Sequence, residues 1–448
     1  MKKKIVALIL VFIFVFSFPA SAYQITEYEL HSDAAMVISL DTGDVLYAKN
    51  HTERMYPASI TKLMTAIVMV ENIDDLDNTY MTYTKSANNL ILGTGSVVYN
   101  LNIGEKMKAK EALASLLISS HGDTAYMIAE HVGGTIDGFV DMMNEKAEEM
   151  GLADTHYMNP VGLHHDDHYT TAADIYVLAK YAFEIDIIKE MASKATYKME
   201  ATNVHGERTI ANSNLLINPN SNVFYKPTIC GKTGFTDEAG RCLVSTASNG
   251  VYNYMVIVLN AKTANGKRYD FIDSANMYRW AFDNFEYKSV LEPSTPVDEV
   301  KVNLSDDTDH VSVVLEGGLK SLLPKDADLS TVEIKTNLIA EEIDAPVKKG
   351  TVLGTADIYY AEEKIGTINL IAANDVEHSK LKTFARDAKN VTKNFFTSTF
   401  MKIVYALIGL VVFSFIALTV WLNLTKKKRR NIKYKPIKKS EFDDQNNP

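Results

Sequence analysis

The sequence predicts a mixed α/β domain with an antiparallel sheet and a helical part, followed by a small all-β domain and one membrane-spanning helix. Three observations support this fold class. Strand-like alternation occurs at both ends of residues 23–288, with helical periodicity between them. Short alternating strands with proline and glycine punctuation follow in residues 289–377. Near the C-terminus, residues 403–422 contain no charge.

The first domain is expected to build its sheet from both ends of its sequence. Two apolar runs flank the turn residues Asp41-Thr42-Gly43-Asp44 in AAMVISLDTGDVLYAKN, which is typical of a hairpin. From Ile60 to about Ala192 helical patterns dominate, as in AKEALASLLISSHGDTAYMIAEHVGG. After Lys226, strand patterns return in PTICGKTGF, RCLVSTAS and YNYMVIVLN, and a helix is expected over about 269–285. This order predicts helices inserted between the hairpin and the later strands.

The second domain is predicted from residue 289 onward by a change in pattern. Its expected strands lie in HVSVVLEGG, TVEIKTN and VLGTADIYYAEEKIGTINLIA, and none of these segments carries residues typical of a catalytic site. The segment LEPSTPVDE is the best candidate for the linker before it. Residues 378–402, mixed charged and aromatic, are expected to form a juxtamembrane spacer.

Both ends of the chain indicate export and membrane attachment. Residues 1–22 combine three lysines, an apolar run and small residues near Ala22, as secretory signal peptides do. The apolar segment 403–422 is long enough to cross a bilayer, and the basic residues of 423–448 mark the cytoplasmic side. We therefore expect a single-pass protein of the cell membrane whose catalytic domain is extracytoplasmic.

Charge and cysteine content narrow the partners. The formal net charge is −10. Without the +3 of the signal peptide and the +6 of the segment from Lys426 onward, the exported part carries about −19. Such an acidic surface excludes nucleic acid as the expected partner. Cys230 and Cys242 are too few for a disulfide-built fold of this size, and whether they bond to each other is left open.

A serine and a lysine lie three residues apart in PASITKLMTA. Residues at this spacing share one face of a helix, so the side chains of Ser59 and Lys62 are expected to project together. A serine hydroxyl needs an adjacent base to act as a nucleophile at neutral pH. A lysine serves as that base only when it is neutral, which burial and a second cation would favour. An isolated S-x-x-K is weak evidence, because an N-capping serine and a solvent-facing lysine give the same pattern.

Two further motifs follow in the order known for penicillin-recognising serine enzymes. Ser120 lies in LLISSHGDTA after an apolar helical stretch, and Lys232-Thr233-Gly234 lies in the expected strand CGKTGFT. Together with AAMVISLDTGDVLYAKN, MNPVGLHHDDHYTTAADI, GKTGFTDEAGRCLV and APVKKGTVLGTADIYY, these segments resemble the D-alanyl-D-alanine carboxypeptidases. These are low-molecular-mass penicillin-binding proteins of the S11 serine peptidase family. The resemblance covers about residues 26–376 and implies a penicillin-binding, transpeptidase-like fold followed by a β-rich domain.

The resemblance also implies a site and its partners. The substrate would be a peptidoglycan stem peptide ending in D-Ala-D-Ala, β-lactam antibiotics would be covalent inhibitors, and no cofactor or metal is implied. Ser59 would be the nucleophile and Lys62 its base, while Ser120 would pass a proton toward the leaving D-alanine. Lys232 and Thr233 would hold the terminal carboxylate. Phe235 would supply a backbone oxyanion donor beside that of Ser59, and Gly234 would keep the strand clear for the bound peptide.

One position departs from the family pattern. Where the second motif usually has Ser-x-Asn followed by Asp, alignment of Ser120 and Asp123 places Gly122 at the asparagine. We expect a weakened enzyme in which water or His121 partly replaces the lost amide, and a Gly122→Asn variant that acylates several-fold faster. That expectation requires that the backbone at Gly122 has no positive φ.

Several alternatives remain at this point. An inactive penicillin-fold scaffold is compatible with the missing asparagine. A class A-like β-lactamase would need a glutamate in an E-x-x-x-N arrangement, whereas THYMNPVGL offers Asn159 without one. A transpeptidase differs only in its acceptor. The residues His164-His165-Asp166-Asp167-His168 resemble a solvated loop more than a zinc site, because metal ligands usually have defined spacing on separate segments or one helix face.

Overall fold

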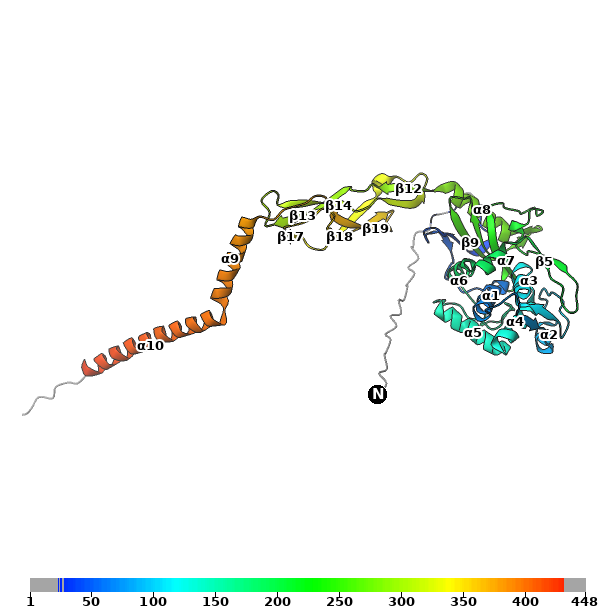
Figure 1. Ribbon diagram of the computed structural model, residues 1–448, viewed down its shortest axis with the longest axis horizontal. Coiled ribbons are helices and arrows are strands. Elements are labelled where there is room, and N and C mark those ends of the chain that lie inside the picture. The colour runs from blue at the N-terminus through cyan, green and yellow to red at the C-terminus, as the bar shows by residue number, and fades with distance from the viewer. Residues whose placement is uncertain (1–22, 24, 26–27, 431–448) are drawn as a thin grey trace, which may run out of the picture. The chain divides into compact units, whose positions relative to one another are not determined.

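The computed structural model describes residues 23, 25 and 28–430. The predicted signal peptide, residues 1–22, lies outside the described residues, as does most of the basic tail. Contacts divide the chain into two units (Figure 1). The first runs to Lys288 and takes in Lys320–Thr331 and Ala361–Glu363, and the second contains the rest.

The first unit is built around a five-stranded antiparallel sheet with the order β2-β1-β9-β8-β7. The hairpin β1 (Ser32–Ser39) and β2 (Val45–Lys49) comes from the start of the unit, as predicted. The remaining strands come from its end: β7 (Thr228–Thr236), β8 (Gly240–Ser248) and β9 (Asn253–Ala261). Strand β7 lies at an edge of this sheet, so the side of its backbone that faces away from β8 has no strand partner there.

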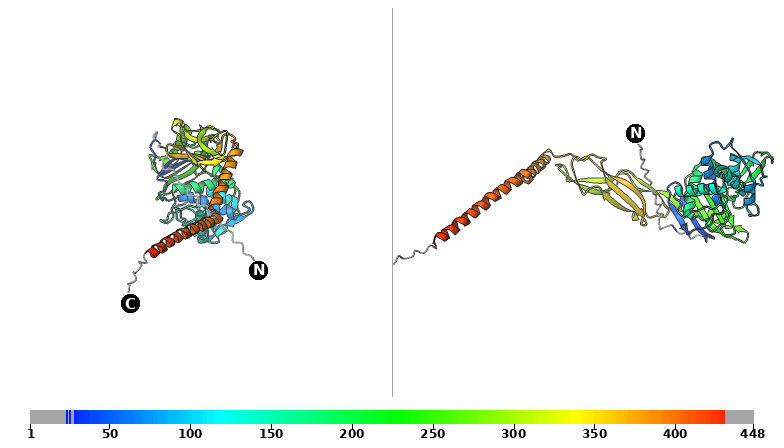
Figure 2. Two further views of the ribbon diagram at one scale, coloured as in Figure 1. Left: turned by 90° about the vertical axis from the view of Figure 1, so that its left-hand side faces the viewer. Right: turned by 90° about the horizontal axis from the view of Figure 1, so that it is seen from below.

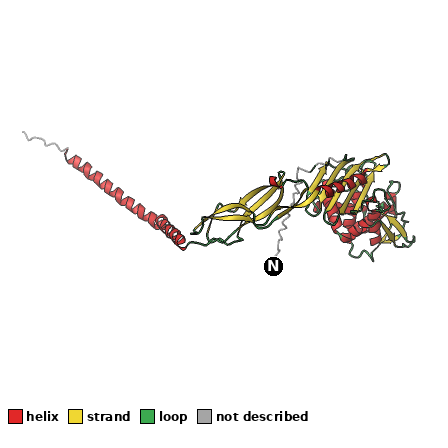
Figure 3. Ribbon diagram, turned by 90° about the horizontal axis from the view of Figure 1, so that it is seen from above, coloured by secondary structure: helices red, strands yellow, loops and turns green. Residues whose placement is uncertain are grey.

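Helices cover both faces of the sheet (Figure 3). Because side chains alternate along a strand, Met36 and Ile38 join one apolar core and Val37 joins the other. The first core packs the helices α1 (Lys62–Asn72), α2 (Lys85–Ile91), α3 (Ala109–Ile118), α4 (Gly122–Gly133), α5 (Ile136–Glu149), α6 (Ala172–Glu184) and α7 (Asp186–Ser193). The second core packs α8 (Tyr269–Asn284), which ends one residue before the predicted bound.

Short strands interrupt the predicted helical region and the segment after it. They form three small antiparallel pairs: β3 (Tyr80–Thr82) with β4 (Lys106–Lys108), β5 (Thr196–Met199) with β6 (Arg208–Ala211), and β10 (Thr263–Ala264) with β11 (Lys267–Arg268). Strands of two to four residues are too short to show an alternating pattern, so they could not be predicted from the sequence.

The second domain is all-β, as predicted. Its six-stranded sheet has the order β16-β18-β19-β14-β13-β17. The strands are β13 (Pro296–Asn303), β14 (His310–Leu315), β16 (Glu333–Leu338), β17 (Glu342–Asp344), β18 (Val352–Tyr360) and β19 (Glu363–Ala372). A separate pair joins β12 (Phe285–Leu291) to β15 (Leu319–Pro324). Apolar side chains such as Val311, Val313 and Leu370 form its own core.

Two helices follow the β domain. The expected spacer contains α9 (Lys380–Thr397), and α10 (Thr399–Arg430) contains the whole predicted span 403–422 (Figure 2). Residues Thr399–Lys426 of α10 are long and apolar enough to cross a membrane, with a mean hydropathy of 2.7 over the most apolar stretch.

Candidate active site

Ser59 lies on the single 3₁₀ turn η1 (Ala58–Thr61), which leads directly into α1. In a 3₁₀ turn, side chains three residues apart eclipse each other. Lys62 Nζ accordingly lies 2.8 Å from Ser59 Oγ. The S-x-x-K spacing thus brings the two side chains together at the point where the 3₁₀ turn continues into the α-helix.

The turn that carries Ser59 is held in an unusual backbone conformation. Ala58 has a φ of +46°, a left-handed value that costs energy for a residue with a Cβ. Gly162 packs against it: an ideal Cβ at Gly162 would lie 1.8 Å from the Ala58 carbonyl oxygen. Gly162 itself has a φ of +86°. The glycine of NPVGL is therefore required by both its own backbone and its contact with the Ser59 turn.

Lys62 is buried in a site that favours its neutral form. Its side chain is 0% exposed, and Nζ donates to the Val161 carbonyl at 2.7 Å. Burial, helped by the positive charge of nearby Lys232, lowers the pKa of Lys62 well below its ordinary value, and Asp123 opposes this shift. A neutral amine beside a serine hydroxyl can accept its proton.

The loop after α5 brings the Val161 carbonyl to Lys62. Asn159 Oδ1 accepts hydrogen bonds from the backbone N–H groups of residues 161, 162 and 163, at 3.1, 2.8 and 3.0 Å. Thr65 Oγ1 of α1 donates to the Pro160 carbonyl at 2.7 Å. The NPVGL segment therefore acts as a rigid support for the lysine. Asn159 occupies no catalytic position here, because its amide is used within the loop.

His168 corrects part of our expectation for the histidine-rich loop. His165, Asp166 and Asp167 are exposed, as expected, but His168 is buried and its Nε2 lies 2.8 Å from Thr61 Oγ1. Its Nδ1 accepts the Met158 N–H at 3.2 Å, so Nε2 carries the proton and donates to Thr61. Burial lowers the pKa of His168 to about 3. This neutral histidine ties the loop to the Ser59 turn, and the described residues hold no group of three or more His, Cys, Asp or Glu arranged for a metal.

Ser120 and Lys232 form the second pair of the site. Ser120 follows the end of α3 with a φ of +63°, a conformation that turns the chain sharply before α4. Lys232, on β7, is fully buried and donates from Nζ to Ser120 Oγ at 2.7 Å and to the Thr233 carbonyl at 2.9 Å. Burial lowers the pKa of Lys232 to about 7. The site therefore contains two lysines, each hydrogen-bonded to a serine hydroxyl.

The rest of β7 borders the same site. Thr233 Oγ1 donates to Ser213 Oγ at 2.7 Å, and Phe235 is 48% exposed. An ideal Cβ at Gly234 would lie 2.8 Å from the Pro57 carbonyl oxygen and 3.1 Å from Ser59 N. Gly234 thus lets the strand pack directly on the Ser59 turn, which is a nearer reason for a glycine than the clearance of a bound peptide that we expected.

A cleft of about 800 Å³ opens onto these residues. Its lining includes Ser59, Ser120, Thr233, Gly234 and Phe235, and also residues that the sequence did not single out: Ser96, Val161, Ser213, Arg241 and Arg268. Val161 and Arg241 lie in segments that carry the family resemblance, but no role was expected for them, and the other three lie outside the quoted motifs. They reach the cleft through long-range packing.

Two arginines bring positive charge to one part of the cleft. The Arg241 guanidinium stacks over the Phe235 ring at 4.1 Å, and its Nε is buried without a hydrogen-bond partner among the described residues. Arg268 is paired with the buried carboxylate of Asp270. Burial, and then the charge of Arg268, lowers the pKa of Arg241. Asp270 neutralises part of this positive charge, and Asp237 and Glu238, which also line the cleft, balance it further.

Gly122 begins α4 and has no positive φ, so the backbone condition for an asparagine is met. The space is not free, however. An ideal Cβ there would lie 2.5 Å from Ser96 Oγ and 2.7 Å from Ile91 Cδ1. His121 does not line the cleft; its Nδ1 is 2.9 Å from Ser115 Oγ, and burial lowers its pKa to about 4. The structure thus gives no support to His121 as the replacement for the missing amide.

The two cysteines are free and buried. In the register of β7 and β8, Cys230 lies opposite Thr246 and Cys242 opposite Gly234, so the two sulfurs sit at different levels of the sheet. Cys230 Sγ lies 3.1 Å from Thr246 Oγ1. The question that the sequence left open is answered by strand register, which keeps the thiols apart.

Comparison with known proteins identifies the family. A family model described as D-alanyl-D-alanine carboxypeptidase matches residues 21–263, more than half of the chain. The chain belongs to this family. A second model, the C-terminal domain of penicillin-binding protein 5, matches residues 285–378 of the carboxypeptidase. Two predictions made from the motifs are confirmed: the family and its serine D-Ala-D-Ala carboxypeptidase activity.

Curated relatives and solved structures agree with this assignment. The carboxypeptidase is 29% identical to D-alanyl-D-alanine carboxypeptidase DacF of Bacillus subtilis, over 86% of this chain and 97% of that protein. It is 29% identical to DacC of Escherichia coli, over 82% and 90% of the two chains. The structure of penicillin-binding protein 5 from Haemophilus influenzae matches with a TM-score of 0.58 at 24% identity, covering 79% of this chain and all of that one. At that identity the structural match shows the fold alone.

Proposed function

We propose that the carboxypeptidase removes a terminal D-alanine through an acyl-enzyme on Ser59, with Lys62 as the base. The observation that carries this proposal is the pair itself: Lys62 Nζ lies 2.8 Å from Ser59 Oγ, is fully buried, and has a lowered pKa at the edge of an open cleft. An inward-facing lysine without a carboxylate partner is costly unless it is neutral. Its neutral form is the one that the reaction requires.

In the acylation step, Ser59 Oγ attacks the carbonyl carbon of the penultimate D-alanine, and its proton passes to Lys62 Nζ. The C–N bond then breaks, and the proton held on Lys62 Nζ passes by way of Ser120 to the leaving D-alanine amine, which returns Lys62 to its neutral form. Water hydrolyses the resulting ester, which releases the shortened peptide and restores Ser59. Ser120 suits this role because its hydroxyl is already hydrogen-bonded to an amine, Lys232 Nζ.

Backbone N–H groups of Ser59 and Phe235 are proposed to bind the oxyanion. The near contact between the Gly234 Cβ position and Ser59 N, 3.1 Å, supports the pairing, because the amide of Phe235 follows Gly234 directly. Loss of one such donor typically costs about 3 kcal/mol of transition-state stabilisation. Lys232 and Thr233 would bind the terminal carboxylate.

The substrate we propose is the peptidoglycan stem peptide ending in D-Ala-D-Ala, with β-lactams as acylating inhibitors. Strand β7, at the edge of the sheet, would pair with the extended peptide, as sheet edges do in other peptide complexes. We also propose that α10 crosses the membrane once, with the catalytic domain outside and the basic tail in the cytoplasm.

Covalent labelling by a fluorescent penicillin tests the nucleophile. Wild type should be labelled and Ser59→Ala should not, while both give the same thermal unfolding curve. Release of D-alanine by Ser59→Ala at the wild-type rate would exclude Ser59 as the nucleophile. If neither protein is labelled and neither releases D-alanine, the chain is a penicillin-fold scaffold, the alternative that the missing asparagine suggested.

A further inference from the structure

The segment Thr94–Val97, here called the cleft loop, lines the cleft together with Ser59 and Ser120. It follows α2 and contains Gly95, whose φ of +74° allows a tight bend. The sequence GTGSVV carries no catalytic motif, and no role for it has entered the mechanism above. Its place in the cleft raises the question of what it contributes.

The cleft loop is fixed against the start of α4. The Gly122 N–H donates to the Val97 carbonyl at 2.8 Å. Just beyond the loop, the buried Asp123 carboxylate accepts the N–H groups of Tyr99, Asn100 and Leu101, at 2.9, 2.9 and 3.1 Å. These contacts are made by Gly122 itself and by Asp123, the residue that follows it. The loop therefore keeps a set position relative to Ser120.

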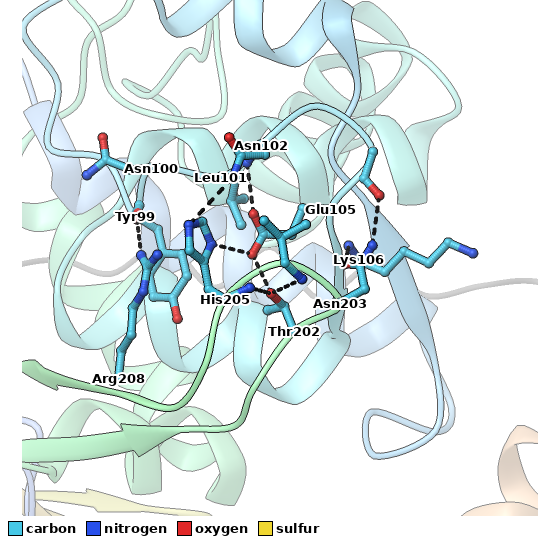
Figure 4. A network of polar contacts seen from close by, with 12 residues as sticks. Tyr99, Asn100, Leu101, Asn102, Glu105, Lys106, Thr202, Asn203, His205 and Arg208 are labelled. Atoms are coloured by element: carbon cyan, nitrogen blue, oxygen red, sulfur yellow. Dashed lines mark hydrogen bonds and ion pairs between the residues drawn. The ribbon is translucent and has the colours of Figure 1, made fainter.

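A second network holds residues 99–105, the segment that follows the cleft loop (Figure 4). The Arg208 guanidinium donates to the Tyr99 carbonyl at 2.9 Å and stacks over its ring. The buried Glu105 accepts from the Asn102 N–H at 2.8 Å and from Thr202 Oγ1 at 2.6 Å, and His205 Nδ1 lies 2.9 Å from it. Figure 4 shows Thr202 and His205 of the β5–β6 connection pointing toward Glu105, which belongs to the segment that follows the cleft loop. This network fixes the segment that directly follows the cleft loop.

Ser96 occupies the space of a missing side chain. Its Oγ lies 2.5 Å from the ideal Cβ position of Gly122, where the family pattern has asparagine. The hydroxyl is poorly satisfied within the protein, because its hydrogen bond to the Val97 carbonyl is 3.5 Å long. That carbonyl is already bonded to Gly122 N–H. The hydroxyl thus remains available to a ligand in the cleft.

We propose that the Ser96 hydroxyl is a substrate-positioning group that replaces the absent asparagine amide, by donating a hydrogen bond to the amide carbonyl on the acyl side of the bound peptide or penicillin. This inference rests on the proposed function. The leaving side already has Lys232 and Thr233 for its carboxylate, so the acyl side is where a further donor is needed. The carboxypeptidase would then keep this contact through a loop residue, with glycine at 122 making room for it.

A Ser96→Ala variant tests the contact. We expect the acylation rate with benzylpenicillin, which carries a side-chain amide, to fall about 3- to 10-fold, the effect of one neutral hydrogen bond. Acylation by 6-aminopenicillanic acid, which lacks that amide, should not change. Ser119→Ala is the matched control, because the Ser119 hydroxyl is donated to the Ala211 carbonyl at 2.8 Å. Equal losses with both penicillins, or no loss with either, would contradict the proposal.

A reciprocal variant tests the shared space. Gly122→Asn alone should lower acylation, because its Cβ would collide with Ser96 Oγ and with the end of the Ile91 side chain. Ser96→Gly combined with Gly122→Asn removes the first of these clashes and should recover acylation above that of Gly122→Asn alone. Gly122→Asn that folds normally and accelerates acylation by itself would show that Ser96 does not hold the amide's place. Wild-type labelling on Ser59 is measured in parallel. If the wild type is not labelled, the proposed function is refuted. If the wild type is labelled normally and Ser96→Ala acylates at the same rate, only the role of Ser96 is refuted.

Discussion

Gly162 lies so close to the Ala58 carbonyl that a single added carbon would overlap it. This contact joins the loop that orients Lys62 to the residue before Ser59. Because Ala58 is held at a φ of +46°, the turn is under strain that the loop must balance. The relationship links the backbone geometry of the Ser59 turn to one residue 104 positions away in sequence, and it yields the first prediction.

Gly162→Ala should abolish penicillin acylation and lower the melting temperature strongly. Gly151→Ala is the control, because Gly151 has a φ of +73° but no atom within 4 Å of its Cβ position. In the control, the free energy of unfolding should fall by about 1 kcal/mol, which is the cost of the left-handed backbone alone, and the acylation rate should not change. Equal behaviour of the two variants in thermal melts and labelling would mean that the contact with Ala58 is unimportant.

Lys62→Ala should lose acylation by several orders of magnitude while the domain stays folded. Its removal leaves two groups without their hydrogen bond to Lys62 Nζ, the Val161 carbonyl and the Ser59 hydroxyl, which is a small loss for the whole domain. Stopped-flow acylation by a fluorescent penicillin measures the loss, and circular dichroism checks the fold. A Lys62→Ala protein that acylates normally would end the assignment of Lys62 as the base.

The pH profile should reflect the two buried lysines. Lys62 is neutral above its lowered pKa. Acylation should fall as the pH drops through this pKa, because the lysine becomes an ammonium that cannot accept the Ser59 proton. It falls again as pH rises because Lys232, with a pKa of about 7, loses the charge that binds the carboxylate. The two amines interact, so the limbs belong to the pair. Lys232→Gln should lose the alkaline limb. Its acid limb should move to higher pH, because the charge that helps to lower the pKa of Lys62 is gone. An unchanged profile in this variant argues against the carboxylate role of Lys232.

The penicilloyl adduct should be long-lived. The β-lactamase alternative needs a glutamate that activates water, whereas the matching loop offers Asn159, whose side-chain oxygen is used by three backbone N–H groups. Mass spectrometry after removal of excess penicillin follows the adduct with time. Return to free enzyme within seconds would favour the β-lactamase alternative.

Protease added to intact cells should remove the catalytic domain and spare an epitope placed after Ser440. The basic residues that follow the apolar part of α10 predict this orientation. An epitope inserted after Gly250, on the loop between β8 and β9, is the exposed control that should disappear. Digestion of the epitope after Ser440 as well would show that the basic tail is outside the cell and would contradict the proposed orientation.

Much of this architecture follows from local patterns. The hairpin around Gly43 shows in the sequence because turn residues separate two apolar runs, and the strand that carries Lys232 shows because a short run is bounded by turn residues. Ser59 meets Lys62 because a helical turn brings residues three apart together, whatever surrounds them. Local geometry was sufficient for these features.

Other parts of the site depend on contacts that no local pattern encodes. The carbonyl of Val161 approaches Lys62 from 99 residues away, and a backbone group carries no side-chain signature. His168 looked solvated beside its exposed neighbours, yet it is buried because Thr61 lies across from it. Ser96 and Gly122 share one space only after α2 and α4 pack. Each case required the tertiary structure.

The buried thiols of Cys230 and Cys242 also allow the opening of the sheet to be measured. Burial raises their pKa values to about 11 and about 12, so neither thiol ionises appreciably at neutral pH while the fold is intact. A thiol-reactive dye therefore labels the chain only when β7 and β8 separate. Labelling rates measured with and without a bound penicillin would report how far acylation of Ser59 tightens the strand beside it, with no engineered probe.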